Sequence, residues 1–338
     1  VVDSSVVGGV LQLWDDAFAQ EIEQHAVEIA RGAGRILTGY FGRQITVEFK
    51  DEHERDPVTA ADKEAQEYLV AEIIKRFPDH GILGEEGTNE EKESEEPAKD
   101  ILWVLDPLDG TTNFMNGLPI FASSIGVLYR GWPMAAALYV PWPNSESSSG
   151  GGLVLHCRKG GGCFSDDGPV KVYESDEPVP SRLIGVPGYF GVGQGFTGKL
   201  AGKAGEVRTT GSIAYELAMT ARGVLQYAMF GAPRLWDMAG GALAVVEAGG
   251  TVMTRFRGEK RWHPMECLVP SWEEKTPTMK ELRGWIAPLV AGNRKVAPII
   301  ADNVKSRFNL SGQLRKLTRP LRRRKNKPEA KPEVENKP

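Results

Sequence analysis

Residues 101–112 read ILWVLDPLDGTT, a short apolar run that ends in two aspartates three residues apart. An apolar run of this length followed by Asp-Pro is typical of a buried strand whose carboxyl end leads into a loop. Pro107 fixes one backbone angle, and Gly110 permits a tight turn. We therefore expect this loop to aim the carboxylates of Asp106 and Asp109 at one point.

Oxygen-rich loops of this kind suit Mg²⁺, which prefers oxygen ligands and keeps several waters beside substrate phosphates. The dipeptide Asp106-Pro107 alone would be an ordinary turn opener. Two further elements argue against that simple interpretation. Residues 84–87 read GEEG directly after an apolar pair, and Trp236-Asp237 opens a helical segment rich in Ala and Gly. By itself, Asp237 would be interpreted as a helix N-cap.

The hydrophobic pattern around these motifs alternates between helical and strand periodicity. A chain of 338 residues with 41% hydrophobic residues suggests about two lobes with a sizeable core. Because strands alternate with helices in the second half, we expect an α/β second lobe there. The pattern predicts helices over 15–40, 58–77, 214–222 and 238–248, and strands over 45–49, 101–105, 123–128, 134–140, 183–186 and 225–230.

Charge and cysteine content favour a soluble, cytoplasmic protein. No apolar run approaches the roughly 20 residues that cross a bilayer. The three cysteines form no C-x-x-C pair, which fits a reducing compartment. The carboxyl-terminal residues 315–338 carry ten basic and three acidic residues. With leucines at 310, 314, 317 and 321, this segment is either a solvated, disordered tail or a basic amphipathic helix.

Several motifs together resemble the inositol monophosphatase family, over roughly residues 20 to 305. Their order and separations are those of the family, which makes the match far more specific than any single motif. Residues 272–285 depart from the family's usual path. The matching segments are 56–62 (DPVTAAD), 84–86 (GEE), 103–114 (WVLDPLDGTTNF), 117–119 (GLP), 236–241 (WDMAGG) and 247–250 (EAGG).

The resemblance implies a layered αβαβα sandwich of α+β or α/β class that acts as a Mg²⁺-dependent, Li⁺-sensitive phosphomonoesterase. It also implies a homodimer with two or three Mg²⁺ ions per site and no nucleic-acid partner. We expect residues 1–14 to be an extension, 15–308 the catalytic domain with lobes 15–180 and 181–308, and 309–338 the tail. Residues 309–327 would contact an anionic membrane surface or an acidic protein.

The resemblance also assigns roles to individual residues. Thr111, hydrogen-bonded to Asp62, would orient the attacking water, and Glu85 would share in catalysis. The metal ligands would be Glu85, Asp106, the Leu108 carbonyl, Asp109 and Asp237. The substrate would be bound by Asp109, Gly110, Thr111, Gly211, Ser212, Ile213 and Asp237, partly through backbone N–H groups at helix starts. Simple helix capping is the alternative role for Gly211-Ser212.

One departure from the family concerns substrate choice. Inositol-selective members carry an acidic residue seven positions before the Asp of the Trp-Asp motif, and here that position is Phe230. Either a neighbour such as Tyr227 or Arg234 substitutes, or the substrate is not an inositol phosphate. Inositol monophosphate is the leading candidate, followed by fructose 1,6-bisphosphate, histidinol phosphate and 3'-phosphoadenosine 5'-phosphate.

Parts of the sequence are also compatible with two other classes of function. One is a non-catalytic scaffold or regulatory protein recruited through the basic tail; the presence of every expected catalytic residue argues against it. The other is nucleotide hydrolysis through residues 193–200 (GQGFTGKL), which nearly match a phosphate-binding loop. Leu200 stands where that loop needs a hydroxyl for Mg²⁺, so we interpret the segment as a surface loop.

Overall fold

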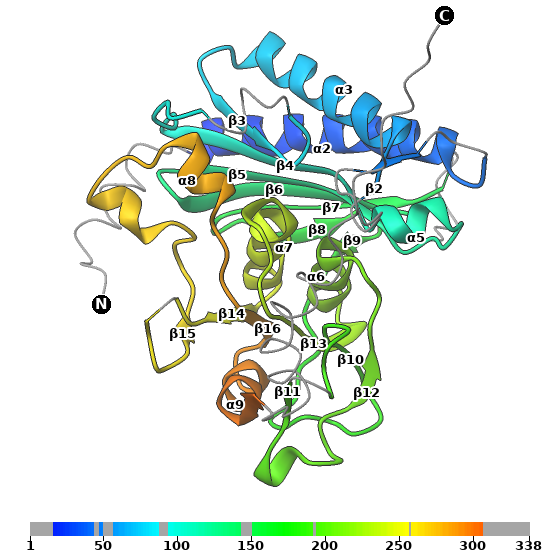
Figure 1. Ribbon diagram of the computed structural model, residues 1–338, viewed down its shortest axis with the longest axis vertical. Helices are drawn as coiled ribbons and strands as arrows, with labels where there is room; N and C mark the ends of the chain where they lie inside the picture. The colour runs from blue at the N-terminus through cyan, green and yellow to red at the C-terminus, as the bar shows by residue number, and fades with distance from the viewer. Residues whose placement is uncertain are drawn as a thin grey trace, which may run out of the picture.

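The computed structural model describes residues 16–43, 47–49, 57–87, 94–142, 151–191, 194–256 and 258–306. These residues stack as five layers in the order helices, sheet, helices, sheet, helix (Figure 1). The layered αβαβα architecture expected from the sequence is confirmed. The expected extension at 1–14, the basic tail at 309–338, for which both a disordered tail and an amphipathic helix were open, and the first residue of the 193–200 segment lie outside the described residues.

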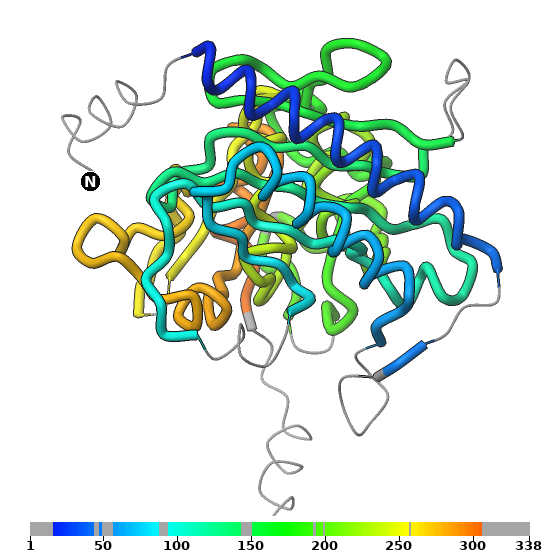
Figure 2. The backbone as a smooth tube through the Cα atoms, turned by 90° about the horizontal axis from the view of Figure 1, so that it is seen from above, coloured from blue at the N-terminus to red at the C-terminus, as the bar shows by residue number. Residues whose placement is uncertain are grey.

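The first layer is a pair of long helices, α2 (Asp16–Tyr40) and α3 (Ala60–Arg76). Figure 2 shows both helices running across one face of the larger sheet. Ile22, Ile29 and Leu37 recur at helical spacing and are fully buried against that face. Just before α3, β1 (Val47–Phe49) and β2 (Pro57–Thr59) form a small antiparallel ribbon.

The larger sheet has seven strands in simple sequential order. Only the β3–β4 pair is parallel; every other neighbour is antiparallel. A short helix, α5 (Thr111–Met115), follows β4 directly. The strands are β3 (Gly81–Gly84), β4 (Ile101–Asp109), β5 (Ala122–Tyr129), β6 (Trp132–Val140), β7 (Leu153–Arg158), β8 (Gly162–Ser165) and β9 (Gly168–Pro169).

The middle layer contains α6 (Ile213–Ala221) and α7 (Leu235–Glu247). Both helices are buried on nearly all sides, because each packs on the larger sheet and on the second sheet at once. The contact with β5 is unusually close: a Cβ at Gly126 would lie 2.8 Å from the Ala239 Cβ, and one at Gly240 would lie 2.7 Å from the Ile125 carbonyl. Glycine at these two positions sets the depth of α7.

The second sheet mixes parallel and antiparallel pairs and carries α9 (Val296–Asn303) on its outer face. In the described residues 194–200, the chain forms β11 (Gln194–Phe196) and a 3₁₀ turn at Gly198–Leu200, so this part is not a strand–loop–helix phosphate site. The strands, in spatial order, are β12 (Glu206–Arg208), β10 (Leu183–Gly185), β13 (Leu225–Phe230), β16 (Leu289–Asn293), β14 (Gly250–Thr254) and β15 (His263–Pro264), with β17 (Val304–Ser306) pairing β11.

The departure at 272–285 is an excursion between β15 and β16. It contains a 3₁₀ turn (Pro270–Glu273) and the short helix α8 (Met279–Arg283). The excursion packs against the segment that leads into β4, where the Met279 N–H donates to the Glu96 carbonyl at 3.0 Å. None of the helices in the described part of the chain combines the length and apolar character that a membrane span requires.

Candidate active site

The paired aspartates lie at the end of β4, which runs four residues further than the apolar run predicted. The expectation of a free loop at 106–109 is wrong, since these residues remain in the strand. Their pairing with β5 shifts in register between Asp106 and Asp109, as at a β-bulge, and this re-aims both side chains. The Leu108 N–H donates to Asp106 Oδ1 at 3.1 Å, which fixes the first carboxylate.

Gly110 makes the turn from β4 into α5. Its φ of 94° lies in the left-handed region, and a Cβ there would come within 3.0 Å of the Ile120 carbonyl oxygen. Glycine is therefore required for Thr111 to begin a helix immediately after the strand. This turn places the Thr111 hydroxyl over the bulge, where it lies 3.0 Å from the Leu108 carbonyl and 3.2 Å from Asp62 Oδ1.

Asp62 is the third residue of α3 and closes a capping box with Thr59. Its Oδ2 accepts the Thr59 N–H at 2.8 Å and the Thr59 hydroxyl, which leaves Oδ1 for Thr111. Burial raises the pKa of Asp62 to about 6, although the bonds from Thr59 oppose that shift. The expected Thr111–Asp62 contact is present, and sequence reasoning did not identify Thr59 as the residue that orients it.

Asp109 joins the larger sheet to the middle helices. Its Oδ2 accepts the Ser212 hydroxyl at 2.8 Å and the Ala214 N–H. Ser212 is also the N-cap of α6, where its oxygen accepts the Tyr215 N–H at 3.3 Å. Capping and site formation are therefore both roles of this serine, and the turn at 211–213 lies against the end of β4.

Asp237 and Glu85 approach from two other elements. Asp237 is not the N-cap of α7: it is the third residue, and its Oδ2 accepts the Arg234 N–H at 2.7 Å. Glu85 directly follows β3, and its N–H donates to the Leu105 carbonyl at 2.9 Å, so parallel pairing carries it beside Asp106. The structure thus gathers Glu85, Asp106, Asp109 and Asp237 from β3, β4 and α7.

The electrostatics of this group are those of carboxylates crowded in a buried place. Burial raises the pKa of Asp106 well above its ordinary value, and the Glu85 and Asp109 charges raise it further. Burial and the charge of Asp237 do the same to the pKa of Asp109. The pKa of Asp237 is raised to about 7, again chiefly by burial. Such a cluster favours either bound protons or a bound cation.

The donor set fits a hard divalent cation. All its side-chain donors are oxygens, and Asp106, Asp109 and Asp237 each direct one oxygen to a protein donor and retain a second for a metal. In the described residues, no three Asp, Glu, His or Cys side chains already enclose one metal-sized point. Coordination therefore requires side-chain movement within the cluster.

A cavity of about 300 Å³ opens beside the Ser212 turn. Its wall includes Phe230, which is 7% exposed, and no Lys or Arg lines it. The expectation that Tyr227 could replace a lost acidic residue is wrong, because Tyr227 is fully buried and its hydroxyl donates to the Ala204 carbonyl at 2.8 Å. The remaining lining residues are Val186–Tyr189, Thr209, Gly211, Ile213, Glu216 and Gly231–Pro233.

Two site residues gave no signal in the sequence. Glu216 on α6 is 3% exposed; its Oε1 accepts the Thr210 N–H and hydroxyl, and burial raises its pKa to about 7. Arg283, at the end of α8, donates to the Gly84 carbonyl at 2.9 Å, next to Glu85. Its own carbonyl accepts from Arg234 Nη1 at 3.2 Å, so α8 bridges the segments that carry Glu85 and Asp237.

These layers, with a carboxylate cluster at the junction of the larger sheet and the middle helices, define the inositol monophosphatase class of α/β sandwich. The family model for the inositol monophosphatase family matches residues 19–287, and the chain belongs to that family.

Individual relatives carry different names. The Nus factor SuhB of Pseudomonas aeruginosa is 35% identical over 233 residues, which cover 67% of this chain and 83% of SuhB. The fructose-1,6-bisphosphatase/inositol-1-monophosphatase of Thermotoga maritima is 32% identical over 239 residues, covering 70% and 85%. Among solved structures, an IMPase of Thermotoga maritima superposes with a TM-score of 0.61 at 26% identity, covering 82% of this chain and 93% of that one.

Proposed function

We propose that this chain is a Mg²⁺-dependent phosphomonoesterase that hydrolyses a small phosphate ester. The observation that carries the proposal is the convergence of Glu85, Asp106, Asp109 and Asp237 beside the Thr111–Asp62 pair. A phosphate monoester is doubly charged near neutral pH, so its hydrolysis needs both an activated nucleophile and neutralised charge. Bound Mg²⁺ would supply both by lowering the pKa of water and by neutralising phosphate charge.

Residues of the chain itself would orient the water, accept its proton and hold the phosphate. Thr111 Oγ1 has two acceptors in reach, Asp62 Oδ1 and the Leu108 carbonyl, so its single proton can point to either while its lone pairs orient a water. Asp62, with a pKa of about 6, can take the proton that this water releases. Backbone N–H groups around Gly110 and Gly211 would hold phosphate oxygens.

The cavity beside Ser212 supports a monophosphate with few hydroxyls as substrate. Fructose 1,6-bisphosphate and 3'-phosphoadenosine 5'-phosphate each carry a second phosphate, and no Lys or Arg lines the cavity to receive it. Phe230 cannot accept hydrogen bonds from sugar hydroxyls, and a site that leaves hydroxyls unpaired selects against them. Histidinol phosphate fits these features, and inositol 1-phosphate, which carries five free hydroxyls, is the comparison substrate that the family implies.

Phosphate release tests the proposal. We expect turnover with Mg²⁺, none with EDTA, and a loss of at least about 10²-fold in kcat/KM for Asp106→Asn. Phe230→Glu should raise kcat/KM for inositol 1-phosphate relative to histidinol phosphate. If the folded protein releases no phosphate from inositol 1-phosphate, histidinol phosphate, fructose 1,6-bisphosphate or 3'-phosphoadenosine 5'-phosphate, the proposed activity is refuted. A non-catalytic role is then favoured; it is the second candidate because a relative of this chain is named as the Nus factor SuhB.

A further inference from the structure

A second cavity, larger than the first, lies at the far end of α7 from the carboxylate cluster. Its volume is about 480 Å³, which is within the range of small-molecule sites. Glu247 ends α7 and lines this cavity, whereas Asp237 stands ten residues earlier, about 15 Å along the helix. The two cavities share no lining residue.

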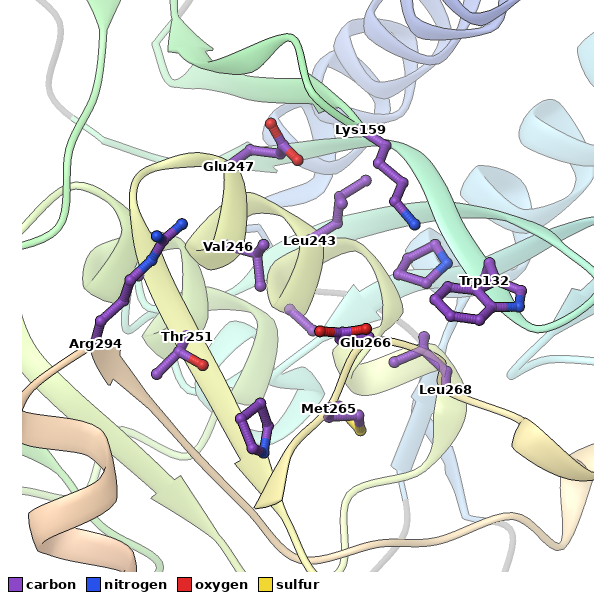
Figure 3. Close-up of a pocket in the computed structure, with 14 residues that line it drawn as sticks. Trp132, Lys159, Leu243, Val246, Glu247, Thr251, Met265, Glu266, Leu268 and Arg294 are labelled. Carbon is purple, nitrogen blue, oxygen red and sulfur yellow. The ribbon is translucent and has the colours of Figure 1, made fainter. Parts of the chain in front are cut away.

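The floor of this cavity is apolar and fixed in place. Leu243 and Val246 of α7 form one side, and Trp132 of β6 forms another (Figure 3). The third side is the segment after β15, including Leu268, whose N–H donates to the Gly131 carbonyl at 2.9 Å. Because this segment is hydrogen-bonded to the β5–β6 turn, the wall is part of the folded core.

Two cations face this floor from opposite sides, as Figure 3 shows for Lys159 and Arg294. The ammonium of Lys159 lies 4.5 Å from the centre of the Trp132 ring, and burial lowers the pKa of this lysine. Neither cation forms a side-chain ion pair with another residue in the described ranges. Lys159 is half-buried and its desolvation is not fully compensated, so it gains from binding an anion; Arg294 is exposed and adds a second positive charge to the lining.

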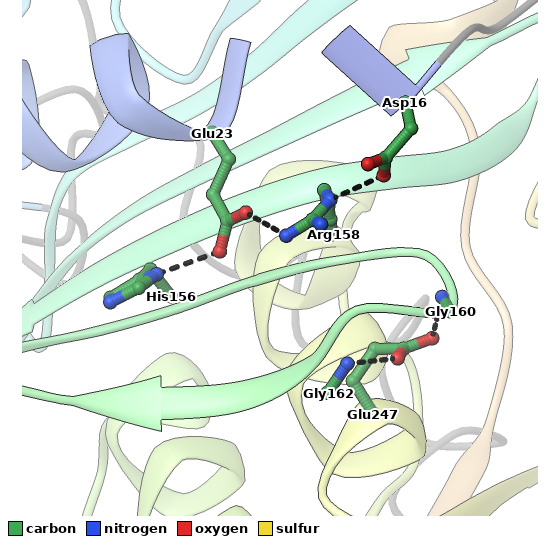
Figure 4. A network of polar contacts seen from close by, with 7 residues as sticks. All are labelled: Asp16, Glu23, His156, Arg158, Gly160, Gly162 and Glu247. Carbon is green, nitrogen blue, oxygen red and sulfur yellow. Dashed lines mark hydrogen bonds and ion pairs between the residues drawn. The ribbon is translucent and has the colours of Figure 1, made fainter. Parts of the chain in front are cut away.

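The nearby carboxylates compensate Lys159 only in part: the charges of Glu266 and Glu247 raise its pKa, but burial outweighs them and lowers it overall. Glu247 turns toward the β7–β8 hairpin, where its two oxygens accept the N–H groups of Gly160 and Gly162 at 2.9 and 3.0 Å (Figure 4). Arg158, just before Lys159, is tied to α2 by Glu23 at 3.1 Å. The hairpin is therefore held on both sides and presents Lys159 in a defined position. Glu266 is an exposed residue of the lining, and its negative charge would oppose a bound anion.

We propose that this cavity binds a small organic anion with an apolar body. The body would lie on Trp132, Leu243 and Val246, and the anionic group would be received by Lys159 or Arg294. The apolar side chains of the floor and the aromatic ring beneath Lys159 suit a ring system rather than a polyol. The proposal is independent of the phosphatase activity.

The test compares two probes that share a ring system. 8-Anilinonaphthalene-1-sulfonate is anionic, and N-phenyl-1-naphthylamine lacks the sulfonate. We expect saturable fluorescence titration of the full chain by the sulfonate. Lys159→Met and Arg294→Met should weaken its binding by about fivefold or more, while affinity for the neutral probe changes by less than about twofold. Glu266→Gln should strengthen sulfonate binding, since it removes a repulsive charge.

Two further variants locate the binding. Val246→Trp should fill the cavity and abolish saturable binding of both probes, and Lys171→Met, an exposed cation outside the cavity, should leave both titrations unchanged. Circular dichroism checks that each variant is folded. If the sulfonate shows no saturable binding, or binds equally well to Lys159→Met, Arg294→Met and the unaltered chain, the proposal is overturned. The lysine and arginine variants keep this comparison available even if Val246→Trp does not fold.

Discussion

The hydroxyl of Thr111 stands between Asp62 Oδ1 and the Leu108 carbonyl, at 3.2 and 3.0 Å. Since its proposed role is to orient water, Thr111→Ala should lower kcat by about 10²- to 10³-fold and change KM by less than about threefold. Thr111→Ser keeps the hydroxyl and should retain most turnover. Steady-state phosphate release measures both constants, and a change confined to KM would contradict the role.

The buried carboxyl of Glu216 should make the free energy of unfolding depend on pH. Its pKa is raised from 4.5 to about 7 by burial, so the folded state holds this proton more tightly than the unfolded chain. Unfolding free energy should therefore fall as pH rises from about 4.5 to about 7. Glu216→Gln removes the ionisation: it should match the unaltered protein near pH 5 and exceed its stability at pH 8 by on the order of 2 kcal/mol.

Urea unfolding in EDTA between pH 5 and 8 tests whether Glu216→Gln gains stability over the unaltered protein as pH rises. The matched control is Glu206→Gln, which changes an exposed carboxylate. Other carboxyls with raised pKa values add their own slope, but they are common to both proteins and cancel in the difference. A variant that is equally destabilised at every pH would mean that hydrogen bonding to Thr210, rather than ionisation, governs the position.

At the scale of elements, the short helix α8 connects two segments at the edge of the site. Arg283 donates to the Gly84 carbonyl and packs near Trp236, with its guanidinium carbon 6.0 Å from the centre of that ring. It therefore holds the segments of Glu85 and Asp237 together. Arg283 should affect metal binding in two opposite ways. Its contacts should favour binding by ordering Glu85 and Asp237, whereas its positive charge should oppose binding.

Substitution separates the two effects. If ordering dominates, as we expect from the direct 2.9 Å bond, Arg283→Met raises the Mg²⁺ Kd by about fivefold or more, and Arg283→Gln, which keeps an N–H donor, raises it less. Isothermal titration calorimetry with Mg²⁺ alone gives these values. Lys280→Ala, which removes an exposed cation of the same helix, is the control. If charge dominates, both Arg283 variants bind Mg²⁺ more tightly.

Elements with strong periodicity were predictable from the sequence, and their ends were not. The helix at α2 and the strand at β4 follow from local patterns, whereas the bulge at Asp106–Asp109 depends on pairing with β5. Asp237 was open to interpretation as an N-cap because nothing in Arg234 signals a cap. The contact of Arg283 with Gly84 joins residues 199 positions apart, and no local pattern encodes it.

The whole molecule is organised around α7, which lies between the two sheets and carries Asp237 in its first turn. Glu85, Asp106 and Asp109 belong to the larger sheet, so the carboxylate cluster joins the middle layer to that sheet. Because burial and mutual repulsion raise the pKa values of Asp106, Asp109 and Asp237, these groups destabilise the fold as they ionise. A cation bound between them should reverse that effect.

Mg²⁺ should therefore stabilise the fold, and increasingly so as pH rises. In EDTA, the raised carboxyl pKa values mean that stability falls as pH rises above about 4, and Asp237, whose pKa is about 7, contributes to that fall up to about pH 7. Mg²⁺ must displace those protons, so it competes poorly at pH 5 and well at pH 8. At a hundredfold excess over Kd, the gain is about 2.7 kcal/mol, or on the order of 5 °C in Tm.

Thermal unfolding at pH 5, 6.5 and 8, with ionic strength matched by NaCl, measures this gain in stability from Mg²⁺. Asp106→Asn should lose most of the increment, and an increment that is constant with pH would show that Mg²⁺ acts elsewhere than on these carboxylates.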